Sequence, residues 1–422
     1  MKPGREPWES VPPKASSEES TSPKTRSAGV MFRHQLYKDE PRTLAPRHLS
    51  PRQPPLVESN EWTSSLNEAA ARLSAGGVRL VYLLHGTFAG TDSLGLLREL
   101  GRFFPALRDG LARIAKRLVD AAMSDNGNFT ALYARRFEQA FRAIGDERTR
   151  VVGAAWSGEN HHLGRADAAV RMIEHLASLR LVEEPYLADG PRVMIWGHSH
   201  AGNVMAMLSQ LLSCDGDLLR AFFDAARCHY QLPIFGRIEI AYWQAVEELL
   251  RGHRRSVVRY PLDFVTFGTP IRYGWNERGF ARLLHFVNHR PADGLPPHLT
   301  TPPTSVDDVL TARHGDYIQQ FGIAGTNTPP FPLLRAWWAD RRLNRLLQPA
   351  DLTSWNLPER LKSGVRVPDA GQTLLVDYGP PRDGIEEHLA GHAVYTRLTW
   401  LPFHAAETAR TLYSDAPGAA PA

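Results

Sequence analysis

Short apolar segments alternate with longer helical ones along most of this chain. Strand-like runs rich in Val, Leu, Ile and aromatic residues occur at 78–84, 151–156, 193–196, 264–267, 284–287 and 374–378. Helical patterns lie between several of them, at 94–119, 164–180, 202–213 and 236–251. Such alternation is typical of an open, mostly parallel sheet with helices on both faces. We therefore expect an α/β, doubly wound fold with its functional site at the carboxyl ends of the strands.

One serine, Ser199, lies at a sharp turn between the apolar strand at 193–196 and a helical segment. A serine in such a turn adopts a strained backbone, and small neighbours two residues away on either side let strand and helix pack closely. Gly197 and Ala201 occupy these positions, and Gly202 follows directly. The pattern predicts Ser199 as a nucleophile, with a turn residue or a helix N-cap as the alternative interpretation.

Composition indicates a globular protein in a reducing compartment. The chain has 422 residues, 43% of them hydrophobic, which is enough for a large core. Only Cys214 and Cys228 occur, too few for a disulfide framework. The N-terminus lacks the apolar stretch of a signal peptide, so we expect a cytoplasmic protein, with export by a specialised machine left open. The uncharged segment 193–213 is the length of a membrane span but is interrupted by Gly, His, Ser and Asn, so no transmembrane segment is expected.

The two ends of the chain differ in composition from its centre. Residues 1–60 are crowded with Pro, Ser and charged side chains and are expected to form a disordered tail, in which 30–37 is a candidate arm that docks on the body. A single folded domain is expected over 61–410, followed by a loose tail at 411–422. Residues 1–60 hold 10 of the 49 basic and 7 of the 45 acidic residues, so the remainder is almost neutral. We expect no nucleic-acid partner.

The first strand runs into His85-Gly86-Thr87, where glycine lets the backbone turn and approach a ligand closely. Acyl transfer needs two preorganised N–H groups for the tetrahedral oxyanion, one usually from the residue after the nucleophile. The N–H groups of Thr87 and His200 are the expected donors, and an ordinary strand-to-loop turn is the alternative. Substrate contacts are expected from His85, Gly86, Phe88 and His198.

Four short motifs, in this order, resemble an α/β-hydrolase and more narrowly the serine lipases and esterases. They are His85-Gly86-Thr87, Trp156-Ser157-Gly158, the segment from Gly197 to Gly202, and Phe267-Gly268-Thr269-Pro270. The resemblance covers about residues 78–405. It implies an α/β-hydrolase fold, Ser199 as nucleophile, and an acid and then a histidine further along the chain. It also implies a small-molecule or lipid ester as substrate, cleaved without a cofactor.

The same resemblance places the acid in the loop after the strand at 284–287, where Asp293 is the first choice. Pro-Ala-Asp-Gly also predicts a turn. The alternatives are Asp316, Asp263 and Asp383. The histidine is expected after the strand at 374–378, at His392 in preference to His388, with His314 third.

A zinc site at His388 and His392 is the alternative use of these two histidines, because residues four apart share one helix face. The segment between them lacks the glutamate of an H-E-x-x-H motif, and Gly391 weakens a continuous helix. We therefore expect no metal.

Two insertions, 88–148 and 297–372, are predicted to be helical caps. The second contains an apolar cluster made of Phe331, Leu333, Leu334, Trp337 and Trp338. The general preference for burial favours this cluster as the core of the cap. A pocket for an acyl chain and peripheral contact with a lipid surface are the alternatives.

Hydrolysis of carboxylic esters is the activity that the resemblance implies for this chain. Acyl transfer to an acceptor other than water and hydrolysis of thioesters or amides use the same triad and oxyanion hole. A scaffold that has the fold without the chemistry is a further alternative, because a fold by itself does not determine function.

Overall fold

The computed structural model describes most of the chain between residues 44 and 414, together with two residues near the N-terminus. The described residues are 32–33, 44–86, 128–154, 156–182, 187, 190–232, 238–253, 257–270, 272–325, 327–328, 330, 333–347 and 365–414.

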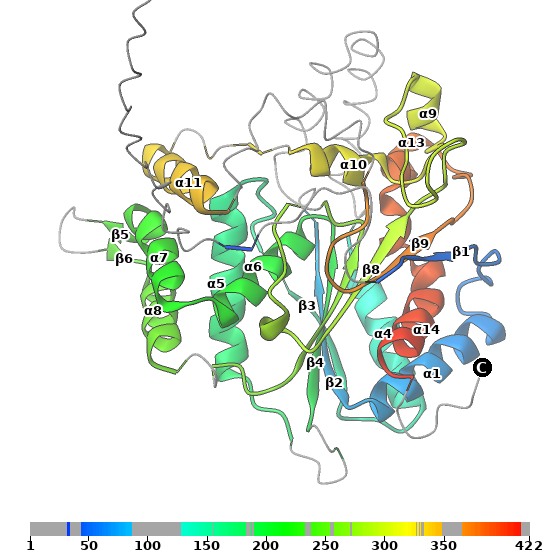
Figure 1. Cartoon of the computed structure of the whole chain (residues 1–422). Coiled ribbons are helices and arrows are strands. Elements are labelled where there is room, and N and C mark those ends of the chain that lie inside the picture. Colours follow the sequence, from blue (N-terminus) through cyan, green and yellow to red (C-terminus); the bar gives the residue numbers. More distant parts are fainter. Residues whose placement is uncertain are drawn as a thin grey trace, which may run out of the picture.

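Seven parallel strands form a single sheet in the order β1-β9-β8-β7-β4-β2-β3 (Figure 1). Their bounds are β1 Arg47–Leu49, β2 Val78–Leu84, β3 Arg150–Ala154, β4 Arg192–His198, β7 Leu262–Phe267, β8 Arg282–Asn288 and β9 Gln372–Val376. Since every pair is parallel, all carboxyl ends lie at the same edge. The prediction of an α/β fold with a parallel sheet is confirmed.

The strand order reverses at β2. The chain runs from β2 outward to β3 and then crosses back, so that β4 pairs with the other side of β2. Such a reversal opens a crevice beyond the carboxyl ends of the two central strands, where ligands of open α/β sheets bind. The loop that begins at His85 and the turn at Ser199 both follow strands that border this crevice.

Helices cover both faces of the sheet (Figure 1). One face carries α5 His162–Ser178 and α6 Ala201–Ser213, with α7 Gly216–Tyr230, α8 Ala241–His253 and α11 Leu334–Leu347 packed outside them. The other face carries α1 Asn60–Ala75, α4 Ala131–Ala143 and α14 Leu401–Leu412. The smaller elements are the hairpin β5 Gln231–Leu232 and β6 Ile238–Glu239, the short helices α9 Val306–Leu310, α10 Tyr317–Ala324 and α13 Ile385–His388, and single turns at Glu277–Gly279, Leu389–Gly391, Ala393–Thr396 and Leu398–Trp400.

Alternate residues of the strands point into two separate cores. In β4, Val193 and Ile195 join the core beneath α5 and α6, whereas Met194 and Trp196 join the core beneath α1 and α14. All seven residues of β4 are buried, and so are those of β2. Burial on both faces explains why these strands are unbroken apolar runs in the sequence.

All six predicted strands are present, but several boundaries differ from those expected. Residues 44–59, expected in the tail, contain the edge strand β1, which pairs with β9. Helix α4, expected in the first cap, packs on the sheet beside α1. The predicted helix at 236–251 begins only at Ala241, because 238–239 pair with β5. The predicted helix at 94–119 lies outside the described residues.

Two residues of the candidate arm at 30–37, Phe32 and Arg33, are described, and both contact the body. Phe32 is buried against Phe222 of α7, and the backbone N–H and C=O of Arg33 both bond the side-chain amide of Gln210. None of the described helices combines the length and the apolar character that a bilayer crossing needs.

The apolar cluster of the second cap lies at the surface. Leu333 and Leu334 precede and begin α11, and they are 67% and 72% exposed, while Trp338 is 50% exposed. Trp337 is half-buried, and Phe331 lies outside the described residues. The prediction that this cluster forms a cap core is therefore wrong. The helix buries Ala336, Ala339 and Leu343 instead, on the side that faces α7 and α5.

Candidate active site

Ser199 lies in the turn between β4 and α6 with φ of 55°, in the left-handed region that a non-glycine residue rarely adopts. Two hydrogen bonds from the neighbouring strand end hold this conformation. The Ser199 N–H donates to the Phe267 carbonyl over 2.8 Å, and the Thr269 hydroxyl donates to the Ser199 carbonyl over 2.9 Å. A strained residue that its surroundings hold in place is typical of a functional position.

Small residues around Ser199 are required by close packing. A Cβ on Gly197 would lie 2.4 Å from the Met205 sulfur, and one on Gly202 would lie 2.1 Å from the Thr269 hydroxyl. The close approach of strand and helix therefore needs glycine at 197 and 202, whereas position 201 accepts the methyl group of Ala201, which is fully buried. This explains the one departure of the segment from the G-x-S-x-G spacing.

His392 and Asp316 form a buried hydrogen-bonded pair. The His392 Nδ1–H donates to Asp316 Oδ2 over 2.7 Å, and neither side chain is exposed to solvent. With its proton on Nδ1, the neutral imidazole carries its lone pair on Nε2. This is the arrangement that an acid–base histidine needs.

Asp316 reaches the sheet edge through a long loop that folds back. It follows β8 in the chain, and an antiparallel bridge between His289 and Gly315 returns the backbone to the end of that strand. The Asp316 N–H then donates to the Asn288 carbonyl, and Asp316 Oδ1 caps α10 by accepting the Gln319 N–H over 2.8 Å. One carboxylate oxygen is thus fixed by the helix, and the other is left for His392.

Tyr395 and Arg366 complete the surroundings of Asp316, and the sequence singled out neither. The Tyr395 hydroxyl donates to Asp316 Oδ2 over 3.1 Å and accepts the Asn288 N–H over 2.6 Å. Burial, and next the negative charge of Asp316, raise the pKa of Tyr395 well above its usual value. Arg366 is buried and bonds the Asn288 carbonyl, and its charge faces Asp316. A hydroxyl donor and a guanidinium charge therefore lie beside the Asp316 carboxylate.

His198, which directly precedes Ser199, ties the turn to the segment of His392. The His198 Nε2–H donates to the His392 carbonyl over 3.2 Å, and the two imidazole rings lie 4.5 Å apart between centroids. The segment that carries the buried pair is therefore adjacent to the turn. We expected His198 to touch substrate, but it is fully buried and positions His392.

The loop after β2 meets the turn as its sequence suggested. A Cβ on Gly86 would lie 2.7 Å from the Ser199 Cβ, so only glycine fits there. His85 stacks on Trp156, and its backbone carbonyl accepts the indole N–H of Trp156 over 2.8 Å. Thr87 and Phe88, the expected oxyanion donor and substrate contact, lie outside the described residues.

Positive charge lies beyond His200. Burial, and next the nearby guanidinium groups of Arg165 and Arg272 and the imidazole of His392, hold the pKa of His200 well below its usual value. Arg165 is fully buried and donates to the Tyr273 hydroxyl over 2.9 Å. His200 is therefore neutral, and its surroundings are electropositive.

The carboxylate that bonds His392 is Asp316 rather than Asp293, which corrects the first choice made from the sequence. Asp293 is exposed in a turn closed by a bond between the Leu295 N–H and the Ala292 carbonyl, as the Pro-Ala-Asp-Gly pattern itself predicts. Two further alternatives have other partners. Asp263 bonds Arg192, and Asp383 forms an ion pair with Arg397 near the surface.

The other candidate histidines have structural positions. His388 Nδ1 accepts the Gly391 N–H over 3.2 Å, and the His314 carbonyl accepts from Arg366. Leu389 and Ala390 adopt positive φ, so His388 and His392 are not on one helix face as a zinc site of that spacing requires. Among the described residues no group of three or more His, Cys, Asp or Glu is arranged to hold a metal ion.

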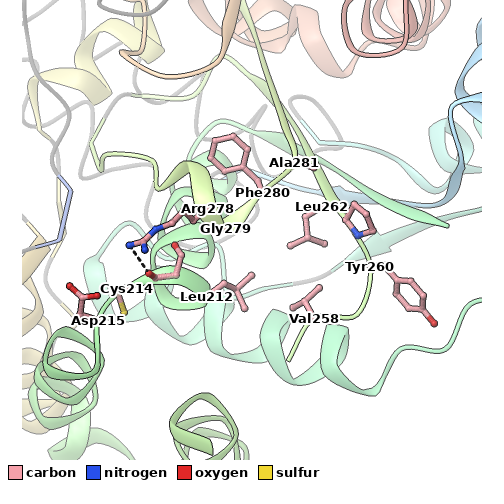
Figure 2. A pocket seen from close by; sticks show the side chains of 12 residues that line it. Leu212, Cys214, Asp215, Val258, Tyr260, Leu262, Arg278, Gly279, Phe280 and Ala281 are labelled. Atoms are coloured by element: carbon pink, nitrogen blue, oxygen red, sulfur yellow. Dashed lines mark hydrogen bonds between the residues drawn. The ribbon is translucent and has the colours of Figure 1, made fainter. Parts of the chain in front are cut away.

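A cavity of about 540 Å³ lies at the other edge of the sheet (Figure 2). It is lined by the last residue of α6, Ser213, by the first residue of β7, Leu262, and by Ala281 before β8. The 13 residues of α6 separate it from the turn at Ser199, a length of about 20 Å at 1.5 Å per residue. This cavity is therefore remote from Ser199.

No protein-family model, curated protein or solved structure matches this chain. Its function therefore has to be inferred from its own residues.

Proposed function

We propose that this chain is an α/β-hydrolase that cleaves carboxylic esters, of small molecules or lipids, through an acyl-enzyme intermediate on Ser199. The observation that carries the proposal is the buried hydrogen bond between His392 and Asp316 next to the strained turn of Ser199. A serine needs an adjacent base to attack a carbonyl at neutral pH, and the base needs an acid that orients it. These three residues supply one side chain for each role.

In the proposed reaction His392 Nε2 takes the proton of the Ser199 hydroxyl while Ser199 Oγ attacks the ester carbonyl carbon. Asp316 holds the Nδ1–H and stabilises the imidazolium that forms. The tetrahedral intermediate collapses, and His392 returns the proton to the leaving alcohol. A water molecule, deprotonated by His392, then attacks the acyl carbon, releases the carboxylic acid and restores Ser199.

The first proposed oxyanion donor is the backbone N–H of His200, which lies at the N-terminal end of α6. The partial positive charge of a helix N-terminus stabilises a developing negative charge there. The guanidinium groups of Arg165 and Arg272 add to this potential. The second donor expected from the sequence is the backbone N–H of Thr87.

Labelling with a neutral fluorophosphonate tests the proposal. We expect wild-type protein to gain one phosphonyl group, the Ser199→Ala variant to gain none, and Ser157→Ala to label as wild type does. Ser157 is the matched control because it is an exposed serine near the same sheet edge. Hydrolysis of p-nitrophenyl esters of increasing acyl length then defines the preferred acyl group. Absence of labelling in folded wild-type protein would overturn the proposal.

A further inference from the structure

The outer surface of α11 combines exposed apolar side chains with several arginines. Leu333, Leu334 and Trp338 are the exposed apolar residues. The helix also carries four arginines, and of these Arg341, Arg342 and Arg345 are exposed and Arg335 is half-buried. We call this set of seven residues the α11 surface. Large apolar side chains that remain exposed beside one another mark an interaction site.

The described part of the chain places no acidic partner beside the arginines of the α11 surface. Its four arginines form no ion pair with another described residue, and Arg341 instead lies over the Trp337 ring, 5.3 Å from its centroid. Helices α5, α7 and α8, on the same face of the sheet, differ, because each of their exposed or half-buried arginines pairs with an acid on the same helix. These pairs are Arg171–Asp167, Arg220–Asp217, Arg227–Asp224 and Arg251–Glu247.

The one acid of α11 faces inward. Asp340 is buried and accepts the Leu163 N–H over 2.9 Å and an amide N–H of Asn327 over 3.3 Å. It therefore anchors the helix without screening the charge outside. The contact with Leu163, in the first turn of α5, also fixes α11 at the edge of the sheet where the parallel strands end.

The α11 surface and the candidate active site thus lie at the same edge of the sheet. Figure 1 shows α11 and α10, the helix capped by Asp316, at the same upper end of the molecule. A partner that binds the α11 surface would therefore lie at the same edge of the sheet as Ser199.

We propose that the α11 surface docks this protein on an anionic lipid bilayer. Leucine and tryptophan side chains enter the boundary between headgroups and acyl chains, while arginine guanidinium groups bond lipid phosphates. The exposed stripe begins with Leu334 and Trp338 and continues with arginines, which suits a helix that enters the bilayer at its N-terminal end. Net positive charge that has no ion-pair partner among the described residues favours an anionic surface. This proposal does not depend on the proposed hydrolysis.

The test is co-sedimentation of the full Ser199→Ala chain with vesicles, which measures binding without turnover. Vesicles of phosphatidylcholine alone are compared with vesicles that also contain phosphatidylglycerol. We expect binding to the anionic vesicles only, weakened by salt as surface charges are screened. Equal binding to both vesicle types, or to neither, would overturn the proposal. If the protein binds neither, the α11 surface would instead be a candidate site for a protein partner.

Variants locate the contact. Leu334→Ser with Trp338→Ser should lower the partition coefficient at least about tenfold. Arg341→Gln and Arg342→Gln should each lower it about fivefold, the effect of one charge near an anionic surface. All four side chains are exposed or lie at the surface, so the variants should unfold at the wild-type temperature.

Two matched controls should bind as the parent does. Leu56→Ser removes a leucine that is 84% exposed next to α1, on the other face of the sheet, and Arg220→Gln removes a paired arginine from α7. A loss in Leu56→Ser as large as that in the α11 variants would contradict the assignment of the surface. Protein that binds vesicles but is not labelled by fluorophosphonate would leave the docking surface standing and overturn only the proposed hydrolysis.

Discussion

Two buried aspartates lie at opposite edges of the sheet, and each accepts hydrogen bonds from a tyrosine and from a basic side chain. At the carboxyl edge, Asp316 accepts hydrogen bonds from Tyr395 and His392. At the amino edge, Asp263 accepts a bond from the Tyr413 hydroxyl and two from Arg192, each of 2.7 Å. Both carboxylates are fully buried. The basic partner is an imidazole for Asp316 and a guanidinium for Asp263.

The difference in partner separates a structural pair from the pair that we propose to be reactive. A guanidinium keeps its proton at every pH that a protein survives, and its two parallel bonds to Asp263 leave nothing to transfer. Arg192 on β4 and Asp263 on β7 are a clamp between neighbouring strands. An imidazole has a second nitrogen that can accept a proton, and we propose that Asp316 supports proton transfer through this nitrogen of His392.

The largest expected effect is on turnover. Asp316→Asn removes the charge proposed to orient and stabilise the His392 imidazolium, and we expect kcat for ester hydrolysis to fall by about a thousandfold or more. Asp263→Asn, measured at a temperature where it is folded, should retain kcat within about threefold of wild type, since its edge is remote from Ser199. Equal losses in the two variants would break the contrast between the two edges.

Stability should show the opposite order. Asp263→Asn leaves the buried charge of Arg192 without its partner, and we expect the free energy of unfolding to fall by about 3–5 kcal/mol. Urea unfolding followed by tryptophan fluorescence measures this change. A loss below about 1 kcal/mol would show that the amino-edge pair is not the clamp described, because that is the usual size for an exposed pair.

The two tyrosines offer a smaller and matched comparison. Tyr395→Phe removes a donor from Asp316, and we expect kcat to fall about tenfold, because hydrogen bonds to charged groups contribute about 1.5–3 kcal/mol. Tyr413→Phe removes the equivalent donor from Asp263 and should lower the free energy of unfolding by a similar amount with kcat unchanged. If Tyr395→Phe changes only stability, the carboxyl-edge tyrosine is structural as well.

Two other buried histidines, His285 and His404, should make the stability of the protein depend on pH, which the guanidinium of Arg192 does not. Burial lowers the pKa of His285 to about 4, and burial likewise lowers that of His404 to about 3. Above pH 6.5 both are neutral in the folded and unfolded chains. Below pH 6.5, each histidine binds a proton only in the unfolded chain. The free energy of unfolding therefore decreases as the pH is lowered, by roughly 1 kcal/mol per pH unit for each histidine, until the pKa of the folded state is reached.

The variant His404→Phe should therefore flatten the dependence of the free energy of unfolding on pH between about pH 6.5 and pH 4 by roughly 1 kcal/mol per pH unit. Urea unfolding at a series of pH values measures the slope. An unchanged slope would show that His404 titrates normally in the folded state.

The sheet could be predicted from the sequence because its central strands are buried on both faces. Val78–Leu84 is buried throughout and contains one charged residue in seven. The edge strand Arg47–Leu49 has three residues and two polar side chains, so it has no apolar pattern. Helix α7 was predictable but missed, since Leu219, Phe222, Phe223 and Ala226 follow the helical spacing.

The candidate site was only partly predictable. Ser199 was predicted because strand, turn and helix are contiguous, so local pattern suffices. Asp316 lies 28 residues after the end of β8 at Asn288, and only the folded loop brings it back to the strand end. Its position before a helix resembles an ordinary N-cap, which conceals its second role. Tyr395 has no local signal, since its function depends on Asp316 and Asn288 together.

The most direct test of the central claim is the rate at which Ser199 is phosphonylated in Asp316→Asn and Asp293→Asn, followed by intact mass and peptide mapping. Both variants replace one carboxylate with its amide, and both carboxylates follow β8 in the chain. The account predicts wild-type labelling of Ser199 in Asp293→Asn and labelling at least about a hundredfold slower in Asp316→Asn. Equal rates in the two variants, or a label on any residue other than Ser199, would contradict it.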